Sequence, residues 1–285
     1  MLVQSIFNSL ALGMTYVLMS CGLTLVFGVS LLINWPHGVL YMLGAYGVYY
    51  LSAQIGVNYF LALFISIALV GGIGVLIEKV INYPLGQTGL LRIMGASLGA
   101  MWFFEGLALV VFGEQDRKVP TVFAGKMNLF GAVLPLDRAV IIIVATLIML
   151  ALYYVLQRTR EGKSIRAVAQ DRVYASLQGI SVRRSRLLSM GIGCGLAGLA
   201  GGLLAPIYYV SPFIGMMPLL KAIIVVTVGG MGSITGSMIA GLALGFIEGF
   251  GYAYLGTWTT IIVFAFLVLV LIIRPQGLFG RLSIE

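Results

Sequence analysis

The chain has 285 residues, of which 60% are apolar and only 9% are charged. A soluble domain carries about 25% charged residues, so this chain cannot cover a water-facing surface, and a mainly soluble globular fold is excluded. Its 17 basic residues exceed its 9 acidic residues, giving a net charge of +8. Because the basic residues cluster between apolar segments, they indicate membrane topology and not a nucleic-acid-binding surface.

Seven apolar segments are long enough to cross a bilayer as helices, since a crossing takes about 20 residues. They cover residues 5–29, 38–55, 59–81, 94–112, 137–156, 187–209 and 257–273. No basic region of the kind found in a signal peptide precedes the first segment, so we expect it to remain as a span. The sequence predicts an all-α, polytopic transmembrane helical bundle that forms a single domain over residues 1–285.

An eighth apolar stretch, residues 219–254, does not fit one plain helix. Its first part, residues 219–228, extends only about 15 Å at helical rise. Three glycines then follow within four residues, and we expect them to break the helix before a second one begins at about residue 236. The fold therefore has about eight membrane elements, which are seven spans and one glycine-broken element.

The charges of the loops predict the orientation in the membrane. Residues 157–186 contain eight basic residues against Glu161 and Asp171, which places this segment in the cytoplasm by the positive-inside rule. The tail, residues 274–285, is predicted to be cytoplasmic as well. An even number of crossings must separate them, so the broken element either crosses twice or returns to its own side. Counting back places the N-terminus outside, on the side of the membrane opposite to the cytoplasm.

Glycines also recur at helical spacing in two of the predicted elements. Such stripes let helix backbones approach closely in a membrane, where no water-driven force brings helices together. They fit static packing, and they equally fit a surface on which helices move in a transporter. The stripes are Gly191 with Gly195, Gly198 with Gly202, and Gly241 with Gly245 and Gly249.

The residues of a catalytic or metal site are missing from the sequence. His37 is the one histidine and has no second ligand at metal-binding spacing. Cys21 and Cys194 lie in apolar runs, which favours packing. Residues 162–164 match the end of a phosphate-binding loop motif, but Gln157 occupies the position where that motif needs its first glycine. We predict a protein that is not an enzyme and binds neither a metal nor ATP itself.

The polar segment 159–181 is too long to be a simple turn between two spans. Four apolar residues repeat every four positions in it, which favours a pair of short amphipathic helices. These residues are Ile165, Ala169, Val173 and Leu177. Such a pair can dock into a groove of a partner protein or lie on anionic lipid headgroups, and the residues alone leave both readings open.

Several motifs then occur in a characteristic order. They are residues 32–38 (Leu-Ile-Asn-Trp-Pro-His-Gly) leading into residues 41–46, residues 161–171 followed by Gly179-Ile180, Lys221-Ala222, residues 229–236, Glu248, and residues 274–280. Over nearly its whole length the chain resembles the branched-chain amino acid ABC-transporter permease family (LivH type). It departs from that family before His37-Gly38, where Asn34-Trp35-Pro36 replaces the usual Asn-Phe-Ala, and the proline and indole would alter the shape of this turn.

The resemblance implies several partners. A homologous second permease would pair with this chain in the bilayer, two cytoplasmic ATP-binding subunits would hydrolyse Mg-ATP, and a periplasmic binding protein would deliver the substrate. It also implies that a coupling segment within residues 157–186 docks onto the ATP-binding subunits, whose closure switches the bundle between two states of access. The implied coupling residues are Glu161, Gly162, Ile165, Arg166, Ala167, Asp171, Ala175, Gly179 and Ile180.

Polar groups and helix breaks at membrane depth are candidates for the translocation pathway, because burying them there is costly without a reason. Glu105, near the middle of the fourth span, either contacts a substrate ammonium group or is held by a neighbouring helix. Glu248 allows the same two roles, and His37 is either a polar tip at the interface or part of a gate. The full candidate set is Asn34, His37, Gly38, Trp102, Glu105, Gly229, Gly230, Gly232, Ser233, Thr235 and Glu248.

These observations predict the permease subunit of an ATP-driven importer for small amino acids, with branched-chain or other apolar ones as the leading substrates. An importer of the same family for urea, short amides or small aromatic acids is an alternative. A stand-alone secondary transporter or channel is another, and it would need carboxylates at ion-coupling positions in broken helices.

Overall fold

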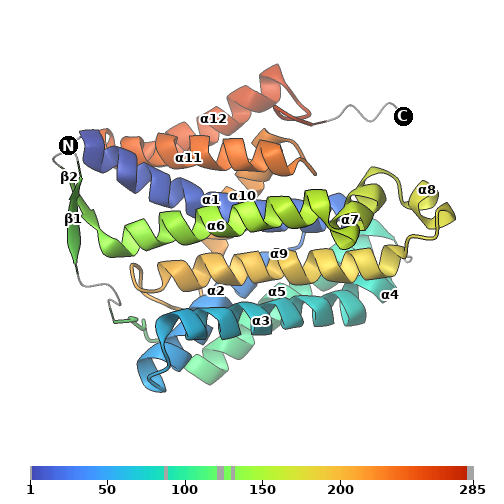
Figure 1. Cartoon of the computed structure of the whole chain (residues 1–285), viewed down its shortest axis with the longest axis horizontal. Coiled ribbons are helices and arrows are strands. Elements are labelled where there is room, and N and C mark those ends of the chain that lie inside the picture. Colours follow the sequence, from blue (N-terminus) through green and yellow to red (C-terminus); the bar gives the residue numbers. More distant parts are fainter. Residues whose placement is uncertain (1, 87–88, 121–124, 130–131, 281–285) are drawn as a thin grey trace.

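The computed structural model describes residues 2–86, 89–120, 125–129 and 132–280. Helices run side by side along the long axis of the molecule and form one bundle (Figure 1). Within the described residues, seven helices are long and apolar enough to cross a membrane. This confirms the predicted all-α polytopic fold. The seven are Leu2–Ser30, Tyr59–Leu85, Leu91–Phe112, Leu136–Arg158, Val182–Leu204, Ile234–Tyr254 and Gly256–Ile273.

The helices of the first half begin with the longest one. They are α1 (Leu2–Ser30), α2 (His37–Val48), the π-helix η1 (Tyr49–Gln54), α3 (Tyr59–Ile77), the π-helix η2 (Glu78–Asn82), α4 (Tyr83–Leu85) and α5 (Leu90–Phe112). A short antiparallel hairpin of β1 (Lys126–Leu129) and β2 (Ala132–Pro135) follows, within the loop predicted for residues 114–136.

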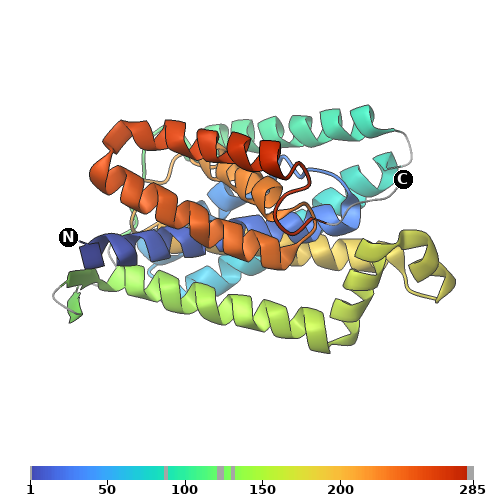
Figure 2. The ribbon, with the colours of Figure 1, turned by 90° about the horizontal axis from the view of Figure 1, so that it is seen from above.

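The second half contains the polar segment and the glycine-rich helices. Its elements are α6 (Leu136–Arg158), α7 (Arg160–Gln170), α8 (Arg172–Leu177), α9 (Val182–Leu204), α10 (Met216–Gly229), α11 (Ile234–Tyr254), the 3-10 helix η3 (Gly256–Trp258) and α12 (Thr259–Ile273). Helices α7 and α8 project at one end of the bundle, far from the N-terminus (Figure 2). We call this end, which carries residues 157–186, the basic end.

Helices α2 and η1 together cover residues 37–54 and so match the predicted segment 38–55, but this run begins inside the bundle. After α1 ends at Ser30, the chain turns back, and the His37 imidazole Nε2 lies 3.0 Å from the carbonyl oxygen of Met19. Met19 is about 16 Å along α1 from its last residue at helical rise. The interval of residues 31–36 therefore brings irregular backbone into the interior, where only surrounding protein can satisfy it.

Helix α10 also begins in the interior, directly against the start of α2. A Cβ atom added to Gly38 would lie 2.6 Å from the carbonyl oxygen of Gly215, the residue that precedes α10. Only glycine at this contact allows the two backbones to approach so closely. Two short helices thus start side by side in the middle of the bundle and run to opposite ends.

The two halves of the chain repeat one arrangement of helices, and the second copy runs through the bundle in the opposite direction. The set α1, α2, α3 and α5 matches the set α9, α10, α11 and α12 in order, and each set has a short second helix that begins in the interior. Helix α1 packs on α11 as α9 packs on α3, and α1 also packs on α9. Inverted repeats of this kind are common in transporters, and this one was not predicted from the sequence.

The predicted glycine stripes lie at these two packed pairs. A Cβ atom on Gly245 of α11 would overlap the backbone of Gly13 in α1, and one on Gly241 would lie 3.0 Å from the Val17 nitrogen. In α9, a Cβ atom on Gly198 would lie 2.9 Å from Val70 of α3. The stripes therefore allow backbone-to-backbone packing, as expected for helices in lipid.

The glycine-broken element forms a hairpin of α10 and α11. Gly230 and Gly232 adopt φ angles of 100° and 85°, which favour glycine, so the predicted break is confirmed. The turn lies at the basic end, where the Leu278 amide donates to the Val228 carbonyl over 2.8 Å. Residues 274–280 therefore share an end with residues 157–186, as the crossing count requires; residues 281–285, with Arg281, lie outside the described residues.

Candidate functional site

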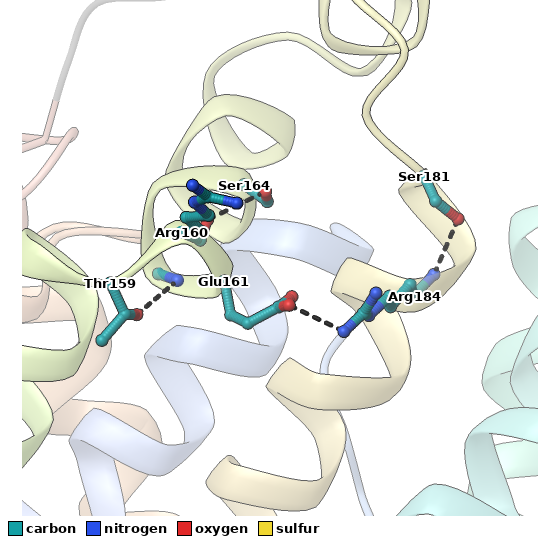
Figure 3. A network of polar contacts seen from close by, with 7 residues as sticks. Thr159, Arg160, Glu161, Ser164, Ser181 and Arg184 are labelled. Carbon is teal, nitrogen blue, oxygen red and sulfur yellow. Dashed lines mark hydrogen bonds and ion pairs between the residues drawn. The ribbon is translucent and has the colours of Figure 1, made fainter.

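The turn from α6 into α7 depends on a close backbone contact. The Gly162 amide donates to the Thr159 hydroxyl over 3.0 Å, so Thr159 caps the first turn of α7 (Figure 3). A Cβ atom on Gly162 would lie 2.5 Å from the Leu156 Cα atom. Residue 162 must therefore be glycine for α7 to fold back against the end of α6.

Helix α7 is attached to the bundle by a buried face and by an ion pair. Ile165 and Val168 are buried, while Glu161 pairs with Arg184 at the start of α9 over 2.7 Å (Figure 3). Ser181 in turn accepts a hydrogen bond from the Arg184 amide. Helix α7 is therefore attached to the start of α9, one of the two central helices.

Helix α8 is capped and attached separately. The Asp171 carboxylate accepts hydrogen bonds from the amides of Val173 and Tyr174, at 2.8 and 2.9 Å. The Arg172 guanidinium donates to the Val29 carbonyl at the end of α1 over 2.7 Å, and burial together with the nearby Arg186 charge lowers the pKa of Arg172. The segment is thus joined to α1 as well as to α9.

The remaining coupling candidates lie on this same helix pair. Arg166 is exposed, Ala167 is half-buried and Ala175 is buried. Gly179 has a φ angle of 78°, which ends the segment, and the Ile180 amide donates to the Ala175 carbonyl. The structure therefore brings all nine predicted coupling residues into one compact unit, and their role in coupling stays a prediction.

An apolar surface points away from the bundle on α8. The side chains of Val173, Tyr174 and Leu177 are 67%, 68% and 76% exposed, although the segment around them is polar. Of the apolar repeat noted in the sequence, Ile165 is buried and Ala169 is exposed. The repeat does not form one continuous stripe because the helix is interrupted at Asp171, and it is divided between an inner and an outer face.

The pathway candidates near the start of α2 are buried. The Asn34 amide nitrogen lies 3.7 Å from the Cys194 sulfur, and its carbonyl oxygen has no partner within the described residues. His37 is fully buried, and its Nδ1 atom also lacks a partner there. These unpaired polar atoms lie where α2 begins, beside the central helices α1 and α9.

A small cavity of about 20 Å³ lies where the two short helices begin. It is lined by Gly38 of α2, Glu105 of α5, and Phe213 and Met216 near the start of α10. Two of the predicted pathway residues, Gly38 and Glu105, therefore meet in one place. Trp102 does not join them, because it does not line the cavity and is 65% exposed.

Glu248 is buried and connects three helices. Its carboxylate accepts hydrogen bonds from the Tyr16 hydroxyl of α1 and from the Lys221 ammonium of α10. Lys221 also donates to the Tyr16 oxygen over 2.9 Å. The sequence predicted a role for Glu248 but not its partners. A lysine within the apolar helix of residues 216–229 was the available signal, since such a charge needs a buried counter-ion.

A second buried pair was missed altogether. Arg186 of α9 donates to the Glu78 carboxylate over 2.6 Å, and the Glu78 side chain is fully buried. Arg186 was treated in the sequence only as a positive charge that sets topology. Glu78 was the available signal, because it lies inside the predicted span 59–81.

The predicted residues of the glycine break lie elsewhere, at the basic end. Ser233 caps α11 by accepting a hydrogen bond from the Gly236 amide over 3.1 Å, and Thr235 is exposed. A Cβ atom on Gly229 would lie 2.5 Å from Gly236, and one on Gly230 would meet the backbone of Gly280. This places Gly229, Gly230, Gly232, Ser233 and Thr235 away from the cavity at Gly38, and their pathway role stays a prediction.

Comparison with known proteins covers nearly the whole chain. The family described as branched-chain amino acid transport system / permease component matches residues 5–272. The high-affinity branched-chain amino acid transport system permease protein LivH of Escherichia coli K12 is 35% identical over 99% of this chain and 96% of its own length. The corresponding protein BraD of Pseudomonas aeruginosa is 32% identical over 99% of this chain and 97% of its own.

A solved structure shares the fold. The structure described as PsaBC from Streptococcus pneumoniae in complex with Fab aligns with a TM-score of 0.52 over 98% of this chain and 93% of that chain, at 15% sequence identity. At this identity the likeness concerns the fold alone.

Proposed function

This chain belongs to the branched-chain amino acid transport permease family, and we propose that it is the membrane-spanning subunit of an ATP-driven importer of small apolar amino acids. In this proposal it pairs with a second, homologous permease in the bacterial inner membrane. Two cytoplasmic subunits bind and hydrolyse Mg-ATP, and a periplasmic binding protein supplies the substrate. The chain itself binds no cofactor and converts work done by its partners into a change of access.

The observation that carries the proposal is the exposed apolar surface of α8. Val173, Tyr174 and Leu177 stand out from a segment that is otherwise polar, and exposed apolar groups of this kind mark protein-interaction sites. The positive-inside rule predicts that this end faces the cytoplasm, where the proposed ATP-binding subunits would lie. A short helix with an apolar face fits a groove in such a partner.

The attachments of the segment explain how docking would change the bundle. Glu161 joins α7 to α9, and Arg172 joins α8 to α1. Because α1 and α9 pack on each other, a partner that pulls the segment acts on both central helices at once. Their glycine contacts allow a small relative shift, which would open or close the region where α2 and α10 begin.

The coupling role is tested with a double variant, Tyr174→Ala with Leu177→Ala. We expect the variant to insert normally into the membrane and to lose both retention of the ATP-binding subunits on purification and ATP-dependent uptake into proteoliposomes. The matched control is Tyr154→Ala, which removes a tyrosine of similar exposure, 64%, from the span α6 and should leave both measurements unchanged. Normal subunit retention and uptake in the double variant would contradict the coupling assignment.

A further inference from the structure

A larger cavity lies at the end of the bundle opposite to α7 and α8. Its volume is about 300 Å³, at the lower end of the range for small-molecule sites. It is an open cavity lined by four parts of the chain: α1, the start of α6, the end of α9 with the residues after it, and the last turns of α11. No residue of the predicted coupling or pathway sets lines it.

The walls of this cavity combine apolar groups with one cation. Leu12, Ile141 and Leu204 supply an apolar surface from three helices. Arg138 supplies a guanidinium group that forms no ion pair among the described residues. The neighbouring Asp137 does not line the cavity, and its buried Oδ1 atom has no hydrogen-bond partner among the described residues. An arginine at the edge of an apolar cavity has the donor geometry for a carboxylate ligand.

Oxygen atoms line another part of the same cavity. Asn8 carries an amide oxygen, and Tyr208 and Tyr252 carry phenol oxygens. These amide and phenol oxygens can accept hydrogen bonds from an ammonium group, which makes this side of the cavity suitable for a positive group. The lining therefore offers a place for an anion, a place for a cation and an apolar surface, all within one small volume.

We propose that this cavity binds an α-amino acid with an apolar side chain. The α-carboxylate would pair with Arg138, the ammonium group would lie against the oxygens of Asn8, Tyr208 and Tyr252, and the side chain would contact the apolar wall. The site rests on the proposed function for its orientation, since the end opposite the coupling segment is then periplasmic. It adds to that function an entry site within one permease subunit, at the end where substrate is delivered.

The charge requirement is tested with the full-length chain in lipid nanodiscs, using equilibrium dialysis of radiolabelled leucine. We expect saturable binding, and about tenfold or weaker affinity in Arg138→Gln, because a charge-assisted hydrogen bond is lost. Arg158→Gln, at the other end of the same helix and exposed, is the matched control and should bind like the wild type. Absence of saturable binding, or equal binding by Arg138→Gln, would overturn the site.

Two leucine analogues test the two ends of the ligand separately. 4-Methylpentanoate lacks the ammonium group and 3-methylbutylamine lacks the carboxylate, so each should compete with leucine at least about tenfold more weakly than leucine itself. Equal competition by 4-methylpentanoate would show a site for apolar anions, such as a lipid headgroup with its chain, and would overturn the amino acid assignment.

A labelling experiment covers the case in which Arg138→Gln fails to fold. Ala253 lines the cavity and is exposed, while the native Cys21 and Cys194 are buried and free, so Ala253→Cys gives a single reactive thiol. Leucine should slow its modification by a small thiol reagent. No protection would overturn the site, and if the complex still shows ATP-dependent uptake that depends on Tyr174 and Leu177, the proposed function stands without it.

Discussion

Two buried ion pairs occupy related places in the inverted halves of the bundle, and they differ in how completely they are satisfied. Glu78 directly follows α3 and pairs with Arg186 of α9, whereas Glu248 of α11 contacts Tyr16 of α1 and Lys221 of α10. In the first pair, Glu78 Oε2 and Arg186 Nη2 have no partner within the described residues. In the second, both carboxylate oxygens accept hydrogen bonds.

The difference indicates that a buried carboxylate is stabilised in two different ways within the same helix arrangement. The Glu78 pair is a two-membered contact that is almost fully enclosed, with side chains 0% and 10% exposed. The Glu248 cluster has three members, and its lysine side chain is 26% exposed. Removing one partner should therefore be more damaging in the first pair, where the Glu78 carboxylate has no second hydrogen-bond donor among the described residues.

The largest expected effect comes from Arg186→Met. This change leaves the Glu78 carboxylate buried without its cation, which costs about 3–5 kcal/mol of unfolding free energy. Unfolding in a denaturing-detergent titration of the purified chain measures it. The double variant Glu78→Gln with Arg186→Met removes both charges and should recover much of the loss. If Arg186→Met alone is as stable as the wild type, Arg186 does not stabilise a buried charge on Glu78.

A smaller effect is expected from Lys221→Met in the other half. Tyr16 still donates to Glu248 after this change, so the carboxylate keeps one of its two partners. We expect a loss of about 1–3 kcal/mol, the cost of one unsatisfied hydrogen bond to a charged group, in the same titration. Adding Tyr16→Phe should increase the loss by more than Tyr16→Phe costs alone, because the two donors share one acceptor. Strict additivity would contradict the shared cluster.

The sequence predicted those features that depend on local composition. The spans α6 and α12, the pair of helices α7 and α8, and the break at Gly230 and Gly232 all follow from apolar length, from helical spacing or from the conformational freedom of glycine. The crossing count also agrees with the structure, because residues 274–280 and residues 157–186 lie at one end of the bundle; the side of the membrane that this end faces stays a prediction. These features could be predicted because each one lies within a single stretch of the chain.

The features that the sequence did not predict depend on contacts between distant residues. Arg186 and Glu78 are 108 positions apart, and the local sequence around either residue does not indicate a contact with the other. The interior start of α2 requires α1 and α10 to be in place around Gly38, so its apolar run was taken for a full span. The cavity at Arg138 is likewise assembled from four separate parts of the chain, and only its individual residues are visible in the sequence.

The smallest expected effect serves as the reference for the two buried pairs. Glu161 and Arg184 are 45% and 70% exposed, so water and salt screen them, and Glu161→Gln should cost less than about 1 kcal/mol of unfolding free energy. Repeating the titration in 1 M salt should remove most of this difference, since the Debye length falls to about 3 Å, whereas the loss in Arg186→Met should persist. If Glu161→Gln instead costs as much as Arg186→Met, burial is not what separates these pairs. The stability of the bundle would then depend on how the basic end is held to α9, and not on the charges enclosed within it.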